Sequence, residues 1–143
     1  RLKPVLESLK IMKKMRVWIE VTNLLIPGYN DNMAEIKKMC EWIEKNLGKD
    51  TPLHFSRFYP CYQLTDSEVT PIETMKKAYE IAKKTGIRYV YLGNVREEGY
   101  GNTHCPKCKK LLIQRVGYNI IVNEIKNGKC SCGQKIAGVW QTI

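Results

Sequence analysis

The sequence lacks a long apolar segment. Its longest early apolar run, residues 21–27, is interrupted by Thr22 and Asn23, whereas a helix needs about 20 apolar residues to cross a bilayer. No secretory leader is recognisable, and the first residue is Arg1 rather than Met. We therefore expect a cytoplasmic protein with no membrane partner, and a chain that is a processed or truncated product.

Glycine and proline are not enriched, and acidic residues are fewer than basic ones. The 143 residues include 10 Gly and 6 Pro, which excludes collagen-like and low-complexity chains. Hydrophobic residues make up 43%, enough to bury a core, so disorder is not expected. The 24 Lys and Arg against 14 Asp and Glu give a formal charge of +10. These cations are scattered doublets on predicted solvent faces, so nucleic acid is not the partner that we expect.

Helix and strand patterns alternate through the first two thirds of the sequence. Helices are predicted over 4–15, 32–47 and 70–85, and strands over 16–26, 53–58 and 87–95. Asn32 and Thr70 each precede a glutamate by three residues, which predicts capped helix starts, and Gly48 and Gly86 predict helix ends. Such alternation is typical of parallel βαβ units. The fold class expected for residues 1–98 is α/β, a partial (β/α) barrel fragment with three parallel strands.

Polar residues alternate with apolar ones in the predicted second strand. His54 and Ser56 alternate with Leu53 and Phe55, so a strand places the polar pair on one face and the apolar pair against the helices. The polar pair either forms hydrogen bonds within the core or contacts a cofactor or substrate. Loops after parallel strands meet at one edge of the sheet, where reactive residues of such folds lie. Here these loops are 27–31, 59–67 and 93–104.

The six cysteines are few enough to consider singly, and four of them form two close pairs. Cys105 and Cys108 have C-x2-C spacing, and Cys130 and Cys132 have C-x-C spacing. In a reducing compartment such pairs indicate a metal more than disulfides, and four thiolates suit structural zinc. The alternatives are a rubredoxin-like iron, His104 in place of one thiolate, and cysteines without a metal.

The composition changes at about Gly99, after which the helical pattern is lost. Short apolar runs at 111–113 and 118–122, with a turn signal at 127–128, predict a small antiparallel hairpin between the cysteine pairs. We expect residues 99–143 to form a four-cysteine zinc-ribbon module that needs its metal to fold. The C-x-C pair is one residue shorter than a standard knuckle, so its turn needs a different geometry.

The other two cysteines stand alone in the sequence. Cys40 falls on the apolar stripe of the helix predicted over 32–47, so we expect it to be buried. Cys61 lies in the loop after the second strand, and no base is identified near it in the sequence. We expect it to be inert.

Several motifs resemble a known family. Residues 21–31, Val-Thr-Asn-Leu-Leu-Ile-Pro-Gly-Tyr-Asn-Asp, look like the fifth-strand segment of radical SAM enzymes related to pyruvate formate-lyase activating enzyme. A more specific likeness is to the C-terminal half of the AmmeMemoRadiSam-system radical SAM enzymes. It is carried by residues 52–60, 70–74, 89–95, 102–106 and 138–140. The resemblance covers nearly the whole chain.

The resemblance implies a partial (β/α)6 barrel that binds S-adenosylmethionine and a 4Fe–4S cluster and cleaves the cofactor reductively to a 5′-deoxyadenosyl radical. It implies that Ile26 and Gly28 border the adenine and that His54, with Ser56 on the same face, corresponds to a histidine that touches the cofactor. The family holds its cluster with a C-x3-C-x2-C motif, which this sequence lacks. We therefore expect the C-terminal half of such an enzyme, inactive alone, with cofactor and cluster bound only by the full-length protein.

A missing half has a structural consequence. The strand over 16–26 would have an exposed edge, which we expect the N-terminal half of the barrel, a protein substrate, a second copy or a rearranged N-terminal helix to cover. The alternative function is a zinc-ribbon module whose basic surface binds nucleic acid or a protein partner. Its stacking residues would be Tyr89, Tyr91 and Trp140, which suit a core equally well.

Overall fold

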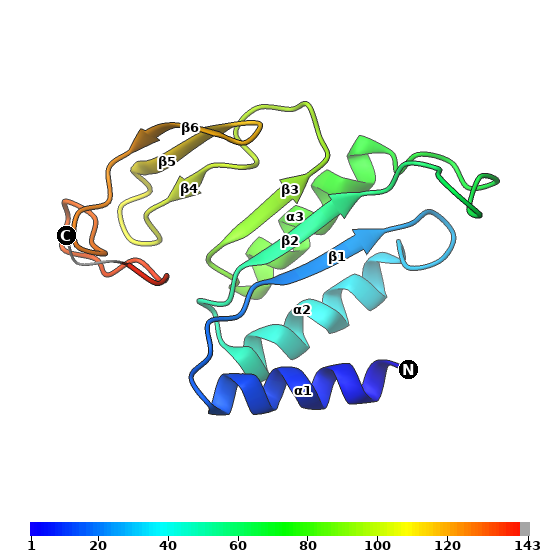
Figure 1. The fold of residues 1–143 in the computed structure, drawn as a ribbon, viewed down its shortest axis with the longest axis horizontal. Coiled ribbons are helices and arrows are strands. Elements are labelled where there is room, and N and C mark those ends of the chain that lie inside the picture. Colours follow the sequence, from blue (N-terminus) through cyan, green and yellow to red (C-terminus); the bar gives the residue numbers. More distant parts are fainter. Residues whose placement is uncertain (141–143) are drawn as a thin grey trace. The chain divides into compact units, whose positions relative to one another are not determined.

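Helices and strands alternate in the N-terminal part of the computed structural model (Figure 1). They are α1 (Leu2–Lys14), β1 (Val21–Leu25), α2 (Met33–Leu47), β2 (Leu53–Arg57), α3 (Ile72–Thr85) and β3 (Val90–Gly93). The structure describes residues 1–140, so the last three residues of the predicted 99–143 module lie outside the described residues. The chain separates into two compact units, unit 1 (residues 1–96) and unit 2 (residues from 97 onward).

The three strands of unit 1 form one parallel sheet in the order β1-β2-β3. Helices α2 and α3 pack against each other on one face of this sheet (Figure 1). Leu53 and Phe55 of β2 are fully buried, whereas His54 and Ser56 between them are only partly buried. The predicted α/β class, the parallel sheet and the period-two burial of β2 are therefore confirmed.

Two of the predicted strands are too long. The strand predicted over 16–26 begins only at β1, because Arg16 adopts a left-handed conformation (φ 61°) after α1 and the following residues have no strand partner. The strand predicted over 87–95 is shortened to β3. The N–H of Ile87 still donates to the last turn of α3, and Asn94 is left-handed (φ 57°) directly after the strand. Composition rich in β-branched residues does not itself create a pairing partner.

Helix α2 begins and ends as its sequence predicts. The side-chain oxygen of Asn32 accepts hydrogen bonds from the N–H groups of Ala34 (2.9 Å) and Glu35 (3.2 Å). Gly48 follows the last turn with φ 91°, a conformation that favours glycine.

Helix α3 does not begin with the predicted capping box. Pro71 occupies the N-cap position, and no side chain caps the helix. The hydroxyl of Thr70 is fully buried, donates to the carbonyl of Leu25 at the end of β1 (2.5 Å) and accepts from the N–H of Phe58 after β2 (3.1 Å). Its hydrogen-bonding capacity is used to join the strand ends, so it is not available to the helix.

Unit 2 contains a second, antiparallel sheet of the strands β4 (Thr103–His104), β5 (Leu111–Val116) and β6 (Asn119–Asn123), in the order β4-β5-β6. Gly117, with φ 58°, opens the two-residue turn of the β5–β6 hairpin. The indole N–H of Trp140 donates to the carbonyl of Ile136 (2.9 Å). The indole ring packs so closely on Gly128 that a Cβ added there would lie only 2.6 Å from it. Among the described residues, no helix combines the length and apolar content needed to cross a membrane.

Candidate metal centre

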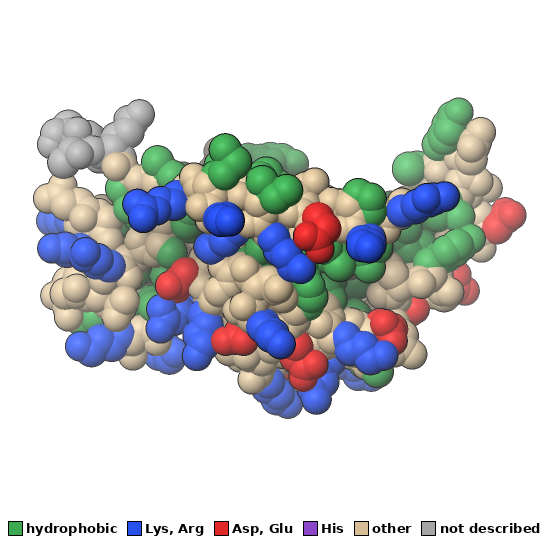
Figure 2. All heavy atoms as spheres, turned by 90° about the horizontal axis from the view of Figure 1, so that it is seen from below, with side chains coloured by type: hydrophobic (Ala, Val, Ile, Leu, Met, Phe, Trp, Pro, Cys, Tyr) green, Lys and Arg blue, Asp and Glu red, His purple; other side chains and the backbone are tan. Residues whose placement is uncertain are grey.

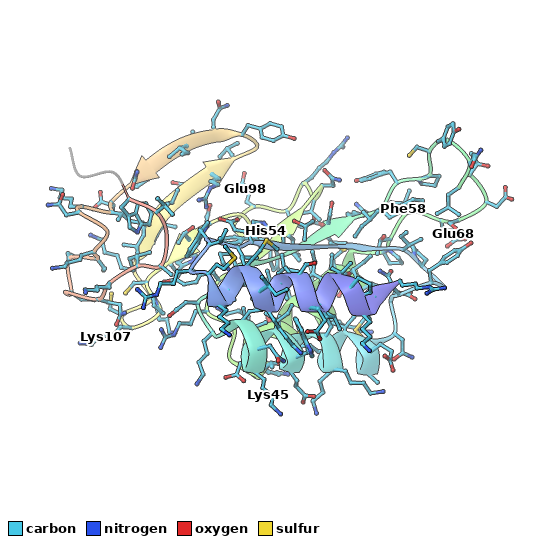
Figure 3. All side chains as sticks on the ribbon, turned by 60° about the horizontal axis from the view of Figure 1, so that its bottom comes forward. Lys45, His54, Phe58, Glu68, Glu98 and Lys107 are labelled. Carbon is cyan, nitrogen blue, oxygen red and sulfur yellow. The ribbon has the colours of Figure 1, made fainter. Side chains whose placement is uncertain are left out.

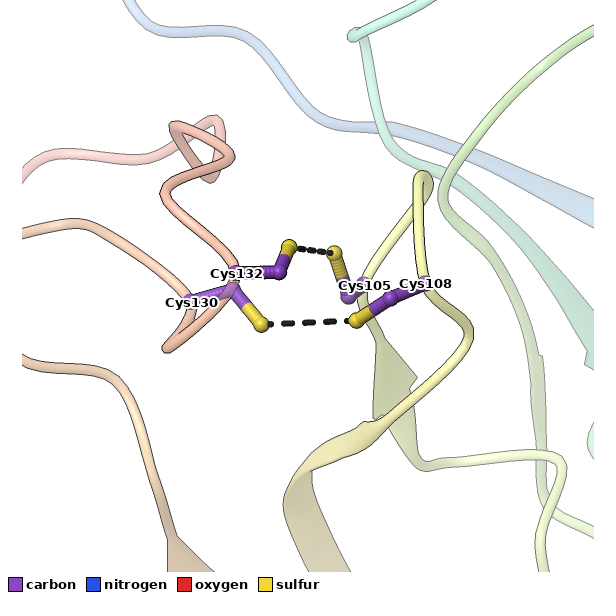
Figure 4. A group of neighbouring side chains, drawn as sticks. All are labelled: Cys105, Cys108, Cys130 and Cys132. Atoms are coloured by element: carbon purple, nitrogen blue, oxygen red, sulfur yellow. Dashed lines mark hydrogen bonds between the residues drawn. The ribbon is translucent and has the colours of Figure 1, made fainter.

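Four sulfur atoms gather in unit 2 (Figure 4). The Sγ atoms of Cys105, Cys108, Cys130 and Cys132 all lie within 4.8 Å of one another. The Cys105–Cys132 sulfurs are 3.7 Å apart and the Cys108–Cys130 sulfurs 3.6 Å. A tetrahedron of sulfurs bound to zinc at about 2.3 Å has edges of about 3.8 Å, whereas a disulfide bond is about 2.05 Å. The four cysteines are free thiols placed where they could hold a metal ion.

Each cysteine pair lies on a turn closed by a backbone hydrogen bond, and the second turn is one residue shorter than the first. In the first turn the N–H of Lys109 donates to the carbonyl of Cys105, four residues back (3.0 Å). In the second, the N–H of Gly133 donates to the carbonyl of Cys130, three residues back (2.9 Å). Both donors have positive φ, 64° and 83°. The second turn thus differs from the standard geometry, as predicted: it is tighter, and its sulfurs still reach the group.

Backbone N–H groups favour the thiolate form of one cysteine in each pair. The N–H of Cys132 lowers the pKa of Cys130 from 9.0 to about 6. Burial raises the pKa of Cys105, but backbone and thiol donors outweigh it and the net pKa is lowered. At Cys108 the N–H of Lys110 lowers the pKa, but the neighbouring thiols raise it to about 11. Close thiolates repel one another, and a cation bound among them would offset that repulsion, as in a metal site.

Lysines flank both cysteine turns. They are Lys107, Lys109, Lys110, Lys129 and Lys135. Four thiolates around a divalent ion carry a net charge of −2, which neighbouring positive charge stabilises. On the face drawn in Figure 2 the Lys and Arg side chains are spread out rather than gathered in one patch.

The remaining cysteines and His104 lie outside this group. Cys40 is fully buried on α2, as predicted, and burial raises the pKa of its thiol to about 11. Cys61 is exposed. His104 at the end of β4 is exposed and does not belong to the four-residue group found among the described residues.

A second set of polar residues lies on the face of the unit 1 sheet opposite α2 and α3. His54 is level with Thr22 of β1 and Tyr91 of β3 in the parallel register. Its Nε2 lies 2.8 Å from a carboxylate oxygen of Glu20, and its ring stacks on Tyr91 with centroids 5.0 Å apart. Figure 3 shows His54 at the sheet, on the opposite side from Lys45 of α2. The imidazole is therefore held in place by Glu20, directly before β1, and by Tyr91 on β3.

Of the residues predicted to border a cofactor, Ile26, Gly28 and Ser56 lie at or near the carboxyl edge of the sheet, and His54 lies deeper along its strand. Ile26 and Gly28 follow the carboxyl end of β1, where the N–H of Gly28 donates to the side chain of Asp31 (3.0 Å). A Cβ on Gly28 would meet nothing within 4 Å, so the space beside it is open. Ser56 is level with Leu24, near this edge. His54 is level with Thr22, two residues deeper than Ser56 and four residues, or about 13 Å, from Ile26 along the strand direction.

A hydrogen-bond network at the carboxyl edge is not indicated by any sequence motif. Arg57 donates through Nε to the carbonyl of Thr70 (2.7 Å) and through Nη1 to the hydroxyl of Tyr59 (3.3 Å). That hydroxyl donates to the carbonyl of Asn94 (3.3 Å), whose amide donates to Oγ of Ser56 (3.2 Å). The network joins the ends of β2 and β3. The available sequence signal for this network was Asn94, directly after β3, because asparagine tolerates the positive φ that turns the chain there.

Comparison with known proteins gives one informative relative and no family. No family model matches the chain. An uncharacterised protein of Methanocaldococcus jannaschii is 47% identical over 138 residues, which are 94% of this chain and 41% of that protein. The chain thus spans less than half the length of the curated relative that it matches. The similarity extends over both units but names no activity.

Proposed function

We propose that this chain is the C-terminal half of a radical SAM enzyme related to pyruvate formate-lyase activating enzyme. The observation that carries the proposal is the parallel β1-β2-β3 sheet, which has helices on one face and polar side chains on the other. Parallel sheets are normally covered on both faces. A larger barrel, in which the polar face lines the interior, would complete this sheet.

Two further surfaces of unit 1 favour a larger protein. Helix α1 has no buried residue: Leu2 and Ile11 on it are 70% and 57% exposed, and Met15 at its C-cap is 70% exposed. Strand β1 has a strand partner on one side only among residues 1–140. The longer relative has more than enough chain to supply a missing half. We propose that this half is the principal partner and covers both surfaces.

In this proposal the carboxyl edge of the sheet binds S-adenosylmethionine. Ile26 and the open backbone at Gly28 would border the adenine, and Ser56 would line the adjacent wall. His54, held by Glu20, would lie on the same wall at a deeper level. The bound cofactor would supply a 5′-deoxyadenosyl radical after reductive cleavage at a 4Fe–4S cluster held by the missing half. The residues of this chain would bind the cofactor and orient it.

Unit 2 would be a zinc ribbon with a structural role. Four thiolates bound to one zinc would leave no open coordination position for a substrate, which distinguishes structural from catalytic zinc. Zinc fits better than iron because nothing else in the unit suggests electron transfer. Free thiols also fit a reducing cytoplasm, which is the location that we propose.

The coding sequence upstream of Arg1 tests the enzyme proposal. We expect a C-x3-C-x2-C motif there. The chain expressed with that segment and reconstituted anaerobically should acquire iron–sulfur absorbance and cleave S-adenosylmethionine to 5′-deoxyadenosine. A control in which the three motif cysteines are replaced by alanine should do neither. A longer protein that binds no cluster under these conditions would refute the proposal.

A further inference from the structure

The β5–β6 hairpin of unit 2 exposes apolar side chains beside an unpaired strand edge. Ile120 and Ile121 are 60% and 59% exposed, and Tyr118 at the turn is fully exposed. β6 is the outer strand in the order β4-β5-β6, so among the described residues its other edge has no partner. We call residues 119–123 with this outer edge the β6 edge.

The β6 edge lacks two of the features by which proteins usually prevent edge pairing, charged residues and proline. Exposed edge strands are commonly protected by charged residues or proline, and residues 117–123 contain neither. A protective feature that is present is a bulge at Ile121, opposite the step from Gln114 to Arg115, but it adds no charge to the edge, and Ile120 and Ile121 are both exposed. Such a strand is suited to pairing with another strand.

The sequence of β6 indicates which strand it fits. Asn119-Ile120-Ile121-Val122-Asn123 reads almost the same in both directions. In an antiparallel pair of two copies centred on Ile121, each isoleucine at the centre would face its equivalent, Ile120 would face Val122, and Asn119 would face Asn123. Apolar β-branched pairs and amide pairs across strands are favourable, and a twofold axis requires this reciprocity.

We propose that β6 pairs antiparallel with β6 of a second copy of this chain, so that the two three-stranded sheets become one continuous sheet. The proposal uses unit 2 alone and does not depend on the enzymatic function proposed above. A nucleic-acid groove would need cations interleaved with aromatic residues, whereas residues 117–123 carry no charge. The net charge of each chain opposes association only weakly at this neutral strip, because the Debye length at physiological salt is about 8 Å.

The dimer should be weak. Pairing two five-residue strands buries less than the roughly 1,200 Å² of a standard stable interface. We therefore expect association in the micromolar range or weaker, visible as a concentration-dependent mass. Higher salt should strengthen it, because the two chains carry charge of the same sign.

Sedimentation equilibrium of the zinc-loaded chain tests the proposal, with Ile121→Lys as the variant and Ile11→Lys as its control. Ile11 on α1 is 57% exposed, close to the 59% of Ile121. Placing two lysines opposite each other should raise the dissociation constant of the dimer about tenfold or more, and Ile11→Lys should leave it unchanged. Zinc content and circular dichroism confirm that each variant is folded. A monomeric wild type at millimolar concentration would overturn the proposal, as would a dimer sensitive only to Ile11→Lys.

Disulfide cross-linking gives an independent test. In a Cys61→Ser background, Ile121→Cys should form a covalent dimer under mild oxidation, because directly opposed residues have Cβ atoms about 4.5–5.5 Å apart, close enough for a disulfide after small movements. Ile11→Cys in the same background should remain monomeric. Cross-linking through position 11 and not through position 121 would contradict the pairing of β6.

Discussion

Units 1 and 2 bury very different amounts of apolar side chain. Unit 1 has a continuous core in which Leu47, Phe55 and Met75 are 1% exposed or less. Among the described residues of unit 2, the buried aliphatic side chains are Leu112, Ile113 and Ile136. Each buried aliphatic side chain contributes about 1.5–3 kcal/mol, whereas fixing each residue's backbone costs about 1–2 kcal/mol. Unit 1 can rely on its core, but unit 2 needs another source of stability.

The four cysteines are that source in our account. Metal binding to a site that does not exist in the unfolded chain contributes directly to folding. The two units should therefore respond differently to metal removal and to loss of core contacts. The following predictions test this difference, from the largest expected effect to the smallest.

Removing the metal, with a chelator or by Cys130→Ser, should unfold unit 2 and leave unit 1 folded. Structural zinc contributes on the order of 10 kcal/mol or more in small modules. Amide hydrogen exchange should show loss of protection in β5 and β6 and retained protection in α2 and β2. Cys61→Ser, which changes an exposed cysteine outside the sulfur group, is the control and should have no effect. Protection of β5 without metal would contradict the account.

Phe55→Ala should destabilise unit 1 by about 3–5 kcal/mol, because Phe55 is fully buried and its removal leaves a cavity. Urea unfolding followed by circular dichroism measures the change in the free energy of unfolding. Tyr62→Ala, at a side chain that is 87% exposed, should change it by less than about 0.5 kcal/mol. The zinc content of both variants should equal that of the wild type, and a loss of zinc in Phe55→Ala would show that the units are not independent.

Thr70→Val should destabilise unit 1 by about 2–3 kcal/mol. The hydroxyl is fully buried, and its loss leaves the Leu25 carbonyl and the Phe58 N–H without their partner. The matched control is Thr65→Val, whose hydroxyl contacts only the exposed Asp66. Equal unfolding free energies for the two variants would show that Thr70 does not join the strand ends.

Lys109→Gly should strengthen zinc binding, and Gly133→Ala should weaken it. Both positions have positive φ, which costs a residue with a side chain about 1–2 kcal/mol. A change of about 1 kcal/mol corresponds to a roughly fivefold change in zinc affinity, measured by competition with a chromophoric chelator. A decrease in affinity for Lys109→Gly would mean that the lysine side chain matters more than its backbone conformation.

Features set by local pattern were predictable from the sequence. The order of helices and strands, the burial of Phe55 and the cap at Asn32 follow from periodicity and from contacts within a few residues. The cysteine group followed from spacing, since two short turns can bring four sulfurs together when a hairpin separates them. None of these needed knowledge of contacts between distant strands.

Features that depend on distant partners were not predictable. Thr70 and Glu73 match the pattern of a capping box, yet the hydroxyl of Thr70 bonds Leu25, a residue 45 positions away. The contact of Glu20 with His54 and the position of Asn94 beside Ser56 depend on the register of parallel strands. One sequence does not contain that register, because several alignments of neighbouring strands bury the same apolar residues.

X-ray absorption spectroscopy at the metal edge, with elemental analysis of the purified chain, tests the central claim most directly. That claim is that a four-thiolate zinc site stabilises unit 2 where an apolar core is lacking. We predict one zinc per chain, surrounded by four sulfur atoms at about 2.3 Å. A chain that folds without metal, or a zinc with nitrogen or oxygen ligands in place of a cysteine sulfur, would contradict it.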